Sequence, residues 1–572
     1  MEGALGISAN EDSIESALRR GYRYRVPDYQ RRYSWKKQQW RELWNDLRAL
    51  EDEQTHFLGA VVVVERPGNL NQLDTLEVVD GQQRLATVSL LLVAMRDRYR
   101  KEGEISQARA INNDYLWVSD LDQNKHQNLT LNTFDNEIYN TLLTTEADRA
   151  QDSQLKSALQ YFHNRVDQTS LDELDTLRKR LLRSFTLVSI ECNSDHSAFR
   201  LFETLNNRGL ELTADDLIKN HLFNVASSNR EVEYERIKKQ WLRIIENIIP
   251  TDVKPALFFR HYLMSSPLLD IQESITEYTL YDRARKIIDK EIPQRELSLE
   301  NLIRDMADAA ELYASILLAD IQKFDDTSNS SVNRKLKDIH AIGMGASGTL
   351  LLRLFQEIDN PNKAFEILQL LEAFLLRQKI VGYPSGAASD RLYARLCSNA
   401  FDQNNPVKRI KQRFLEEVPS DTEFRAGIVE KRATLNSRTR YMLRRIESDH
   451  YHGIDVGNGA DAELEHIAPR AAFSAKKYST WPGHLGVDEE VFEQYKDRLG
   501  NITLLESRHN AASGKHPFQQ KKREYASSKY SMSQEIADQH QEWSTEKIQS
   551  RTEYLADVAT QIWKIEPVNN HR

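Results

Sequence analysis

The stretch Val78-Val79-Asp80-Gly81-Gln82-Gln83-Arg84-Leu85 decides how the first part of the chain folds. A β-branched run ends at Asp80, a glycine can turn the chain, and an apolar-rich segment follows to about Arg100. This order predicts a strand over 75–80 and a long helix over 81–100. The N–H groups at such a helix start favour an anion, Arg84 adds a full positive charge, and Asp80 suits a cation or a ribose hydroxyl. Simple capping of the helix by Asp80 is the alternative.

The neighbouring segments predict mixed α and β structure over the first hundred residues. Residues 22–26 alternate as strands do, and 56–64 form a β-branched run. Residues 36–47 have apolar side chains at helical spacing, and 11–20 also fit a short amphipathic helix.

The segment VPDYQRRYSW (26–35) interleaves aromatic rings with guanidinium groups. Rings can stack on bases while arginines bind phosphates. We therefore expect DNA-sensing residues here, namely Tyr29, Gln30, Arg31, Arg32, Tyr33 and Trp35. The alternative is a proline-led loop that packs its rings onto the core.

A third N-terminal segment is FETLNNRGLELTADDLIKN (202–220). Thr213 with Asp216 three residues later resembles a capping box, although Glu or Gln is more usual at the second position. Capping explains these two residues but leaves Asn206, Arg208 and Lys219 without a role.

From about residue 105 to 430 the apolar spacing predicts mostly helices, with loops at the polar stretches DDTSNSSVN (325–333) and PSGAAS (384–389). Apart from 202–220, this region carries no motif, and we interpret most of it as a helical scaffold.

The last third of the chain changes character. A basic helix is predicted over 437–448, strands over 462–470 and 501–505, and a polar segment from 506. Phosphodiester cleavage needs a base for water and a cation for the phosphate charge. The set His466, Glu465, Asn501 and Asn510 could supply both, and one carboxylate with one amide suits Mg²⁺ or Mn²⁺.

The ordered strings EHIAP (465–469) and LGNITLL (499–505), followed by Asn510, resemble HNH nucleases of the ββα-metal type. With Pro517, Phe518, Lys521 and Tyr525, they resemble the C-terminal domain of GmrSD-type, modification-dependent (type IV) restriction endonucleases. The resemblance implies His466 as general base and Asn501 as the residue that orients the histidine's loop. It also implies Glu465 and Asn510 as metal ligands and places Lys515 near the phosphate.

The three N-terminal segments resemble the N-terminal domain of the same family, which is related to ParB-like nucleotide-binding folds. DGQQR (80–84) is the most specific of these marks. The resemblance implies that a nucleoside triphosphate is bound, and hydrolysed, at Asp80, Gly81, Gln82, Gln83 and Arg84. Asn206, Arg208, Asp216 and Lys219 would complete that site. The chain has no GxxxxGK[ST] string, which excludes a P-loop. GTP, UTP, CTP and ATP are not distinguished.

Charge is unevenly distributed along this chain of net charge −9. Residues 17–41 hold nine Arg or Lys and one acid, 425–445 hold seven and one, and 508–529 hold six and one. This pattern fits a nucleic-acid binder with concentrated contacts. The two cysteines, Cys192 and Cys397, form no CxxC pair, and we find neither an apolar span nor a signal peptide, so we expect a cytoplasmic protein.

We therefore expect an α+β, mainly helical protein. Its expected parts are a ParB-like nucleotide-binding and DNA-sensing domain with a helical extension (1–235), a helical linker or scaffold (236–430) and an HNH nuclease domain (431–572). The expected function is NTP-regulated, Mg²⁺- or Mn²⁺-dependent cleavage of modified double-stranded phage DNA in antiviral defence. A homodimer is one option that the sequence leaves open. The alternative is a nucleotide-switched DNA-binding regulator with an inactive HNH fold, supported by Glu465 where these enzymes often have Asp.

Overall fold

The computed structural model describes residues 7–19, 21–51, 54–68, 73–144, 149–195, 197–199, 201, 213–227, 231–382, 386–401, 405–452, 462–474, 480–514 and 516–566. The chain divides into two compact units, one of residues 1–246 and 278–307 and one of residues 247–277 and 308–572. The divisions at 235 and 430 expected from sequence stay predictions.

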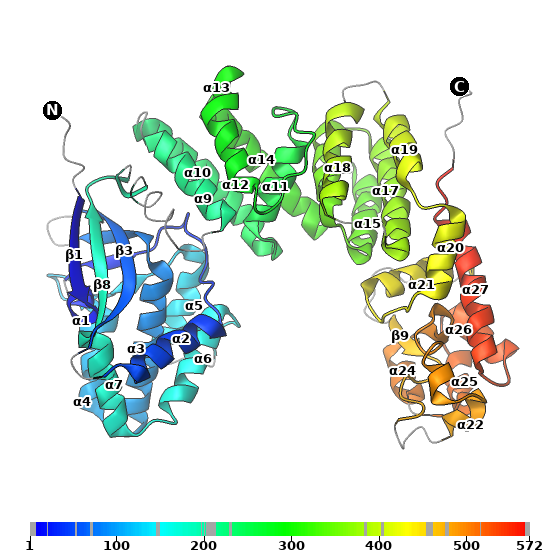
Figure 1. The fold of residues 1–572 in the computed structure, drawn as a ribbon, viewed down its shortest axis with the longest axis horizontal. Coiled ribbons are helices and arrows are strands. Elements are labelled where there is room, and N and C mark those ends of the chain that lie inside the picture. Colours follow the sequence, from blue (N-terminus) through cyan, green and yellow to red (C-terminus); the bar gives the residue numbers. More distant parts are fainter. Residues whose placement is uncertain are drawn as a thin grey trace. The chain divides into compact units, whose positions relative to one another are not determined.

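The first unit is built on a mixed, six-stranded sheet with the strand order β1-β8-β3-β4-β2-β7. Figure 1 labels three neighbouring strands of this sheet, β1, β8 and β3. Its strands and a separate hairpin are β1 (Ile7–Ser13), β2 (Arg23–Arg25), β3 (His56–Arg66), β4 (Thr75–Asp80), β5 (Trp117–Ser119), β6 (Lys125–Gln127), β7 (Leu129–Thr130) and β8 (Phe185–Cys192). β3 pairs in parallel with β8 and antiparallel with β4. The central strands β3 and β4 carry long buried apolar runs, as strands covered on both faces do.

The first unit also contains helices. They are α1 (Ile14–Leu18), α2 (Lys37–Ala49), α3 (Gln82–Lys101), α4 (Ile105–Ile111), α5 (Thr133–Leu143), α6 (Gln154–Val166), α7 (Leu171–Arg183), α9 (Ala214–Ser227), α10 (Glu231–Ile248), α12 (Leu280–Lys286) and α13 (Ile292–Gln294). The π-helical turns η1 (Asn112–Leu116) and η4 (Ile287–Glu291) interrupt this series. α3 is buried along most of its length, so the helix that begins at the DGQQR string is also the centre of the core.

Most sequence predictions for this unit are confirmed, with one error at the start. The strands and helices expected over 22–26, 36–47, 56–64, 75–80 and 81–100 correspond to β2, α2, β3, β4 and α3. Residues 11–13 were expected to be helical but lie in β1, where Glu11 pairs with Val188 and Ser13 with Thr186. Pairing with β8 outweighs the weak helical pattern of this short segment.

The second unit begins as a stack of helices. These are η3 (Ile249–Thr251), α11 (Pro255–Ser265), α15 (Asp326–Ile342), η5 (Gly345–Ser347), α16 (Gly348–Glu357), α17 (Pro361–Val381), α18 (Ala387–Ala400), α19 (Pro406–Glu417), α20 (Asp421–Glu430) and α21 (Ser437–Asp449), while α14 (Leu299–Leu318) contains a unit boundary. The loop expected over 325–333 is wrong, because α15 begins there. Asp325 caps the helix by accepting from Ser328 N at 3.1 Å, and the Asn329 side chain bonds to both backbone groups of Phe324.

The end of the second unit is a two-stranded hairpin followed by a helix. β9 (Glu463–His466) pairs antiparallel with β10 (Ile502–Leu505), and α24 (Ser507–Ser513) follows directly. The remaining elements are α22 (Trp481–Leu485), α23 (Glu489–Phe492), η7 (Leu499–Asn501), α25 (Phe518–Ala526), α26 (Ser531–Gln539) and α27 (Thr545–Ile562). The α+β, mainly helical fold class is therefore confirmed.

Within the described ranges, no helix combines the length and apolar character needed to cross a bilayer. Cys192 and Cys397 are both buried free thiols, so neither forms a disulfide.

Gly500 allows α27 to lie directly on the hairpin. A Cβ at this position would be 2.2 Å from Ile548 O and 2.5 Å from Thr552 Oγ1, which is closer than atoms can approach. We expect Gly500→Ala to lower the free energy of unfolding of the C-terminal region by about 1–3 kcal/mol or more, because packed backbone must move. Thermal unfolding measures this change.

Gly483→Ala in α22 is the matched control, because a Cβ there meets no atom within 4 Å. A Gly500→Ala variant as stable as the Gly483→Ala variant would contradict the close approach of α27.

Candidate functional site

The turn between β4 and α3 requires glycine at position 81. Gly81 has φ +96°, a conformation that other residues rarely adopt, and its Cβ would be 2.8 Å from Val61 Cγ2. The turn places Asp80 at the strand end, directly before the start of α3. Burial raises the pKa of Asp80, and neighbouring Arg84 opposes that rise.

Arg84 lies across the adjoining strand. Its Nη1 donates to Ala60 O at 2.9 Å and is 4.0 Å from Asp80 Oδ2. A Cβ on Gly59 would be 2.8 Å from Arg84 Nε, so the guanidinium lies over a position where only glycine leaves room. Asp80, Arg84 and the helix start together provide cationic and anionic groups at one place.

Gln83 is buried and holds the loop at 32–35. Its Oε1 accepts from Ser34 N at 2.8 Å, and its Nε2 donates to Arg32 O at 3.2 Å. The second glutamine of DGQQR therefore fixes the loop backbone. Gln82 is half-buried.

Gln30 makes a second connection between loop and turn. Its Nε2 donates to Val79 O at 2.8 Å, and its Oε1 accepts from Lys219 Nζ at 2.6 Å. Lys219 is itself buried, which lowers its pKa. Buried hydrogen bonds of Gln30 thus connect β4, the loop at 26–35 and α9.

The start of α9 adds two carboxylates to this cluster. Asp216 Oδ2 accepts from Thr213 Oγ1 at 2.8 Å and is 3.4 Å from Arg31 Nη1. Burial, and then repulsion by Asp216, raises the pKa of Asp215 to about 6. Burial and the charge of Asp216 also raise the pKa of Asp80, so these carboxylates influence one another.

The structure therefore combines two sites that sequence reasoning kept apart. The DGQQR turn lies with Asp216 and Lys219 from the nucleotide prediction, and also with Gln30 and Arg31 from the DNA-sensing prediction. Asn206 and Arg208 lie outside the described residues.

The rings of the DNA-sensing prediction are mostly internal. Tyr29 is 2% exposed and Tyr33 is 7% exposed. Tyr29 OH donates to Glu77, Tyr33 OH bonds to Thr87 Oγ1 at 2.7 Å, and Trp35 is only partly buried against the core. Rings buried in this way cannot stack on bases, so packing onto the core, the alternative explanation, accounts for Tyr29 and Tyr33. Arg32 pairs with Asp135 at 2.9 Å.

In the C-terminal hairpin, His466 stands at the end of β9. Its side chain is 11% exposed, and its Nε2 is buried without a hydrogen-bond partner, 3.8 Å from Asp497 Oδ1. Burial lowers the pKa of His466 to about 4, against the opposing effect of Asp497. Asp497 is held by Arg470 Nε at 2.8 Å. The imidazole is therefore neutral near pH 7, as an acceptor of protons must be.

Asn501 holds the backbone that follows His466. Its fully buried amide accepts from Ala468 N at 2.8 Å and donates to Ala468 O at 2.9 Å and Lys496 O at 2.8 Å. Trp543 Nε1 also donates to its Oδ1, at 3.1 Å. These bonds have the geometry that the predicted loop-orienting role requires.

Glu463 and Glu465 are two residues apart on β9, so both side chains lie on the face covered by α24. Asn510 Nδ2 donates to Glu463 Oε2 at 2.5 Å, a bond that lowers the pKa of Glu463. Glu465 Oε1 accepts from buried Lys521 Nζ at 2.5 Å, and Ser513 Oγ is 3.4 Å away. The predicted ligands Glu465 and Asn510 thus have separate protein partners.

The donor chemistry of this face fits Mg²⁺ or Mn²⁺, because it offers carboxylate and amide oxygens and no thiolate. Among the described residues, no group of three or more His, Cys, Asp and Glu forms a ready metal cluster. Water and phosphate oxygens would therefore have to complete the coordination, as is usual for Mg²⁺. Lys515 lies outside the described residues.

Sequence reasoning missed two carboxylates of this site. Glu463 could have been found from strand alternation, since it shares a face with Glu465. Asp497 follows His466 by 31 residues, and the segment between β9 and β10 separates the two in the sequence. No sequence pattern indicated that Asp497 lies near the imidazole.

Loss of the Gln83 side chain should free the loop that it holds. In Gln83→Ala we expect the Ser34 and Trp35 amides to exchange hydrogen about fivefold faster, because the buried acceptor of both amides is removed and a hydrogen bond is worth about 1 kcal/mol. Hydrogen-exchange mass spectrometry of the peptide covering 32–35 measures this. Gln82→Ala is the control. Equal hydrogen-exchange rates in the two variants would contradict the role of Gln83 in holding the loop.

The Glu465–Lys521 pair can be tested by a double-mutant cycle. Lys521→Met leaves a buried carboxylate unpaired, so we expect a loss of about 3–5 kcal/mol in the free energy of unfolding. Glu465→Gln with Lys521→Met should cost less than the sum of the single changes. Denaturant unfolding gives these values, and simple additivity would mean that the two groups do not interact.

Two family models match the chain. GmrSD restriction endonuclease, N-terminal domain, matches residues 14–223, and GmrSD restriction endonucleases, C-terminal domain, matches residues 418–558. The first match contains the DGQQR turn, the loop that it holds and the start of α9. The second contains β9, β10, α24 and Lys521. Together they span more than half of the chain.

A curated protein, dynein heavy chain-like protein 1 from Plasmodium falciparum (isolate 3D7), is 22% identical over 202 residues. That match covers 32% of this chain and 4% of the relative, so the chain spans a small fraction of that protein and the match carries no argument about activity. The two domain models match in the order N-terminal then C-terminal, and each matched range contains one of the residue clusters described above. These matches show that the chain belongs to the GmrSD restriction endonuclease family.

Proposed function

We propose that this restriction endonuclease cuts modified foreign DNA with an HNH centre that needs a divalent metal, and that a nucleoside triphosphate bound at the DGQQR turn controls the cutting. The observation that carries the proposal is His466, a neutral imidazole with an unpartnered, buried Nε2, beside a strand face with two carboxylates and one amide. Antiviral defence is the role that such cutting would serve.

In this proposal His466 accepts a proton from the attacking water. Asp497 lies near the imidazole and would stabilise its positive charge once the proton has moved, because opposite charges at such distances attract. Asn501 keeps the imidazole's backbone in place through the bonds to Ala468. Each residue thus has a separate task in one reaction.

Glu465 and Asn510 would hold the metal, and Glu463 is the further candidate because it is hydrogen-bonded to Asn510. A bound Mg²⁺ or Mn²⁺ would supply charge stabilisation at the scissile phosphate. Glu465 would have to exchange its bond with Lys521 for the metal, and Lys521 would then be available to the phosphate. The role of Lys515 near that phosphate stays a prediction.

At the N-terminal site, Arg84, Arg31 and Lys219 are the cations for triphosphate oxygens, and Asp80 or Asp216 would carry an accompanying cation. Gln83 and Gln30 connect this site to the loop at 26–35. A nucleotide that displaces either glutamine would therefore move the loop. This connection gives the control of cutting a physical route within the first unit.

The competing proposal, a nucleotide-switched DNA-binding regulator with an inactive HNH fold, rests on one observation. Glu465 is already neutralised by a fully buried lysine, so its carboxylate is not open to a metal in this arrangement. A permanent pair would leave Asn510 and Glu463 as insufficient ligands, and DNA would be bound without being cut.

Cleavage of plasmids tests the proposal. With Mg²⁺ and NTP, we expect the chain to cut DNA carrying modified bases and to spare the unmodified plasmid. His466→Ala should reduce cutting by about 10²–10⁴-fold and leave NTP hydrolysis intact. Arg84→Ala should impair NTP hydrolysis, and with it the control of cutting.

Matched controls separate these effects from misfolding. His484→Ala changes an exposed histidine of the same domain, and Arg100→Ala changes an arginine at the far end of α3. Equal cutting of both plasmids without NTP would reject nucleotide control. Full retention of cutting in His466→Ala would reject the HNH centre, and DNA binding without any metal-dependent cutting would favour the regulator.

A further inference from the structure

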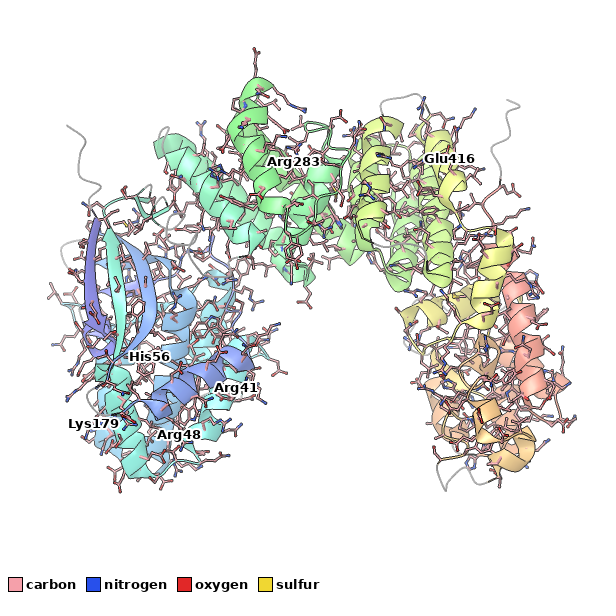
Figure 2. All side chains as sticks on the ribbon, viewed as in Figure 1. Arg41, Arg48, His56, Lys179, Arg283 and Glu416 are labelled. Atoms are coloured by element: carbon pink, nitrogen blue, oxygen red, sulfur yellow. The ribbon has the colours of Figure 1, made fainter. Side chains whose placement is uncertain are left out.

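Helices α18 and α19 form a hollow in the helical part of the second unit that no motif marks. The hollow has a volume of about 390 Å³, and the residues that line it are Arg395, Leu396, Asn399, Ala400, Arg409, Gln412, Arg413 and Glu416. Figure 2 labels Glu416 on α19. The two helices contact each other, and α19 packs on α17, where the Phe374 and Phe414 rings stack at 4.1 Å.

Helix periodicity explains why the lining is so polar. Arg409, Gln412, Arg413 and Glu416 recur at three- and four-residue spacing and form one face of α19. The buried residues of α19, which include Val407, Ile410 and Phe414, form the opposite face. The α19 side of the hollow is therefore lined by side chains that point away from the core, while Leu396 and Ala400 of α18 are buried.

The charges of the lining are suited to phosphate. It carries three guanidinium groups and the amides of Asn399 and Gln412, all hydrogen-bond donors for phosphate oxygens. Glu416 is the one acid among these lining residues, and it pairs with Arg413 at 2.6 Å. Arg413 also pairs with Glu417 on the same helix, so its charge is shared with two carboxylates.

We propose that this hollow binds the phosphate backbone of duplex DNA outside the nuclease centre and positions the duplex for cutting. The proposal rests on the proposed function for the identity of the nucleic acid. No lining residue is aromatic, so the surface offers phosphate contacts and no stacking on bases. The binding is therefore independent of sequence and of modification.

The test is the salt dependence of binding to a duplex of about 30 base pairs, measured by fluorescence anisotropy with the full chain in EDTA. Each phosphate contact contributes about 0.9 to the slope of log K against log salt concentration. For Arg395→Gln with Arg409→Gln, we expect the slope to fall by about 2 and binding to weaken alike for modified and unmodified duplexes.

Arg391→Gln with Lys408→Gln is the matched control. It removes the same charge from the same two helices, at exposed positions that do not line the hollow. We expect this control to keep the slope of the unchanged chain. Thermal unfolding of both double variants checks that each is folded.

Equal slopes in the two double variants, or no binding by the unchanged chain, would overturn the proposal. A greater effect of the lining arginines on duplex RNA than on duplex DNA would overturn the assignment to DNA. Cutting and binding are separate measurements, so equal slopes in the two double variants of a chain that cuts DNA would refute only the binding role of the hollow. If the slopes change as expected but the chain cuts no DNA, only the proposed nuclease activity is refuted.

Discussion

One buried amide determines the geometry of the C-terminal site. Asn501 bonds to both backbone groups of Ala468, to Lys496 O and to Trp543, so the segment after His466 cannot move without breaking several buried hydrogen bonds. Leaving such groups unsatisfied costs about 1–3 kcal/mol each. These hydrogen bonds of Asn501 determine the position of the imidazole. The approach of α27 at Gly500 and the strand face that carries the carboxylates depend on them as well.

In the N-terminal site, the buried amides that hold the backbone belong to two glutamines. Gln83 and Gln30 have buried amides that bond to loop and strand backbone, which leaves Arg84, Arg31 and Asp80 to meet a ligand. In both sites neutral amides hold the backbone, and each cluster also contains a buried lysine, Lys219 in the first and Lys521 in the second. Amides suit this task because they donate and accept at once and cost less to bury than charges.

The sequence predicts elements well where a pattern is long and apolar, as in β3, β4 and α3. It fails where pairing partners or caps are distant, as in β1, whose strand character comes from β8, and at the start of α15. The sequence identifies the motif residues of the candidate sites, but it does not predict which residues they contact. The bonds of Glu465 to Lys521 and of Gln30 to Lys219 join residues 56 and 189 positions apart, and the burial of Tyr29 and Tyr33 depends on packing that no short pattern reveals.

The central claim is that one divalent ion binds beside His466 on the face shared by β9 and α24. A crystal structure with Mn²⁺ and a DNA duplex, with the ion located by its anomalous signal, tests it most directly. The account predicts one peak about 2.1 Å from Asn510 Oδ1 and from a carboxylate oxygen of Glu465 or Glu463, with Lys521 released from Glu465. A peak elsewhere, or none while the Glu465–Lys521 bond persists, would contradict it.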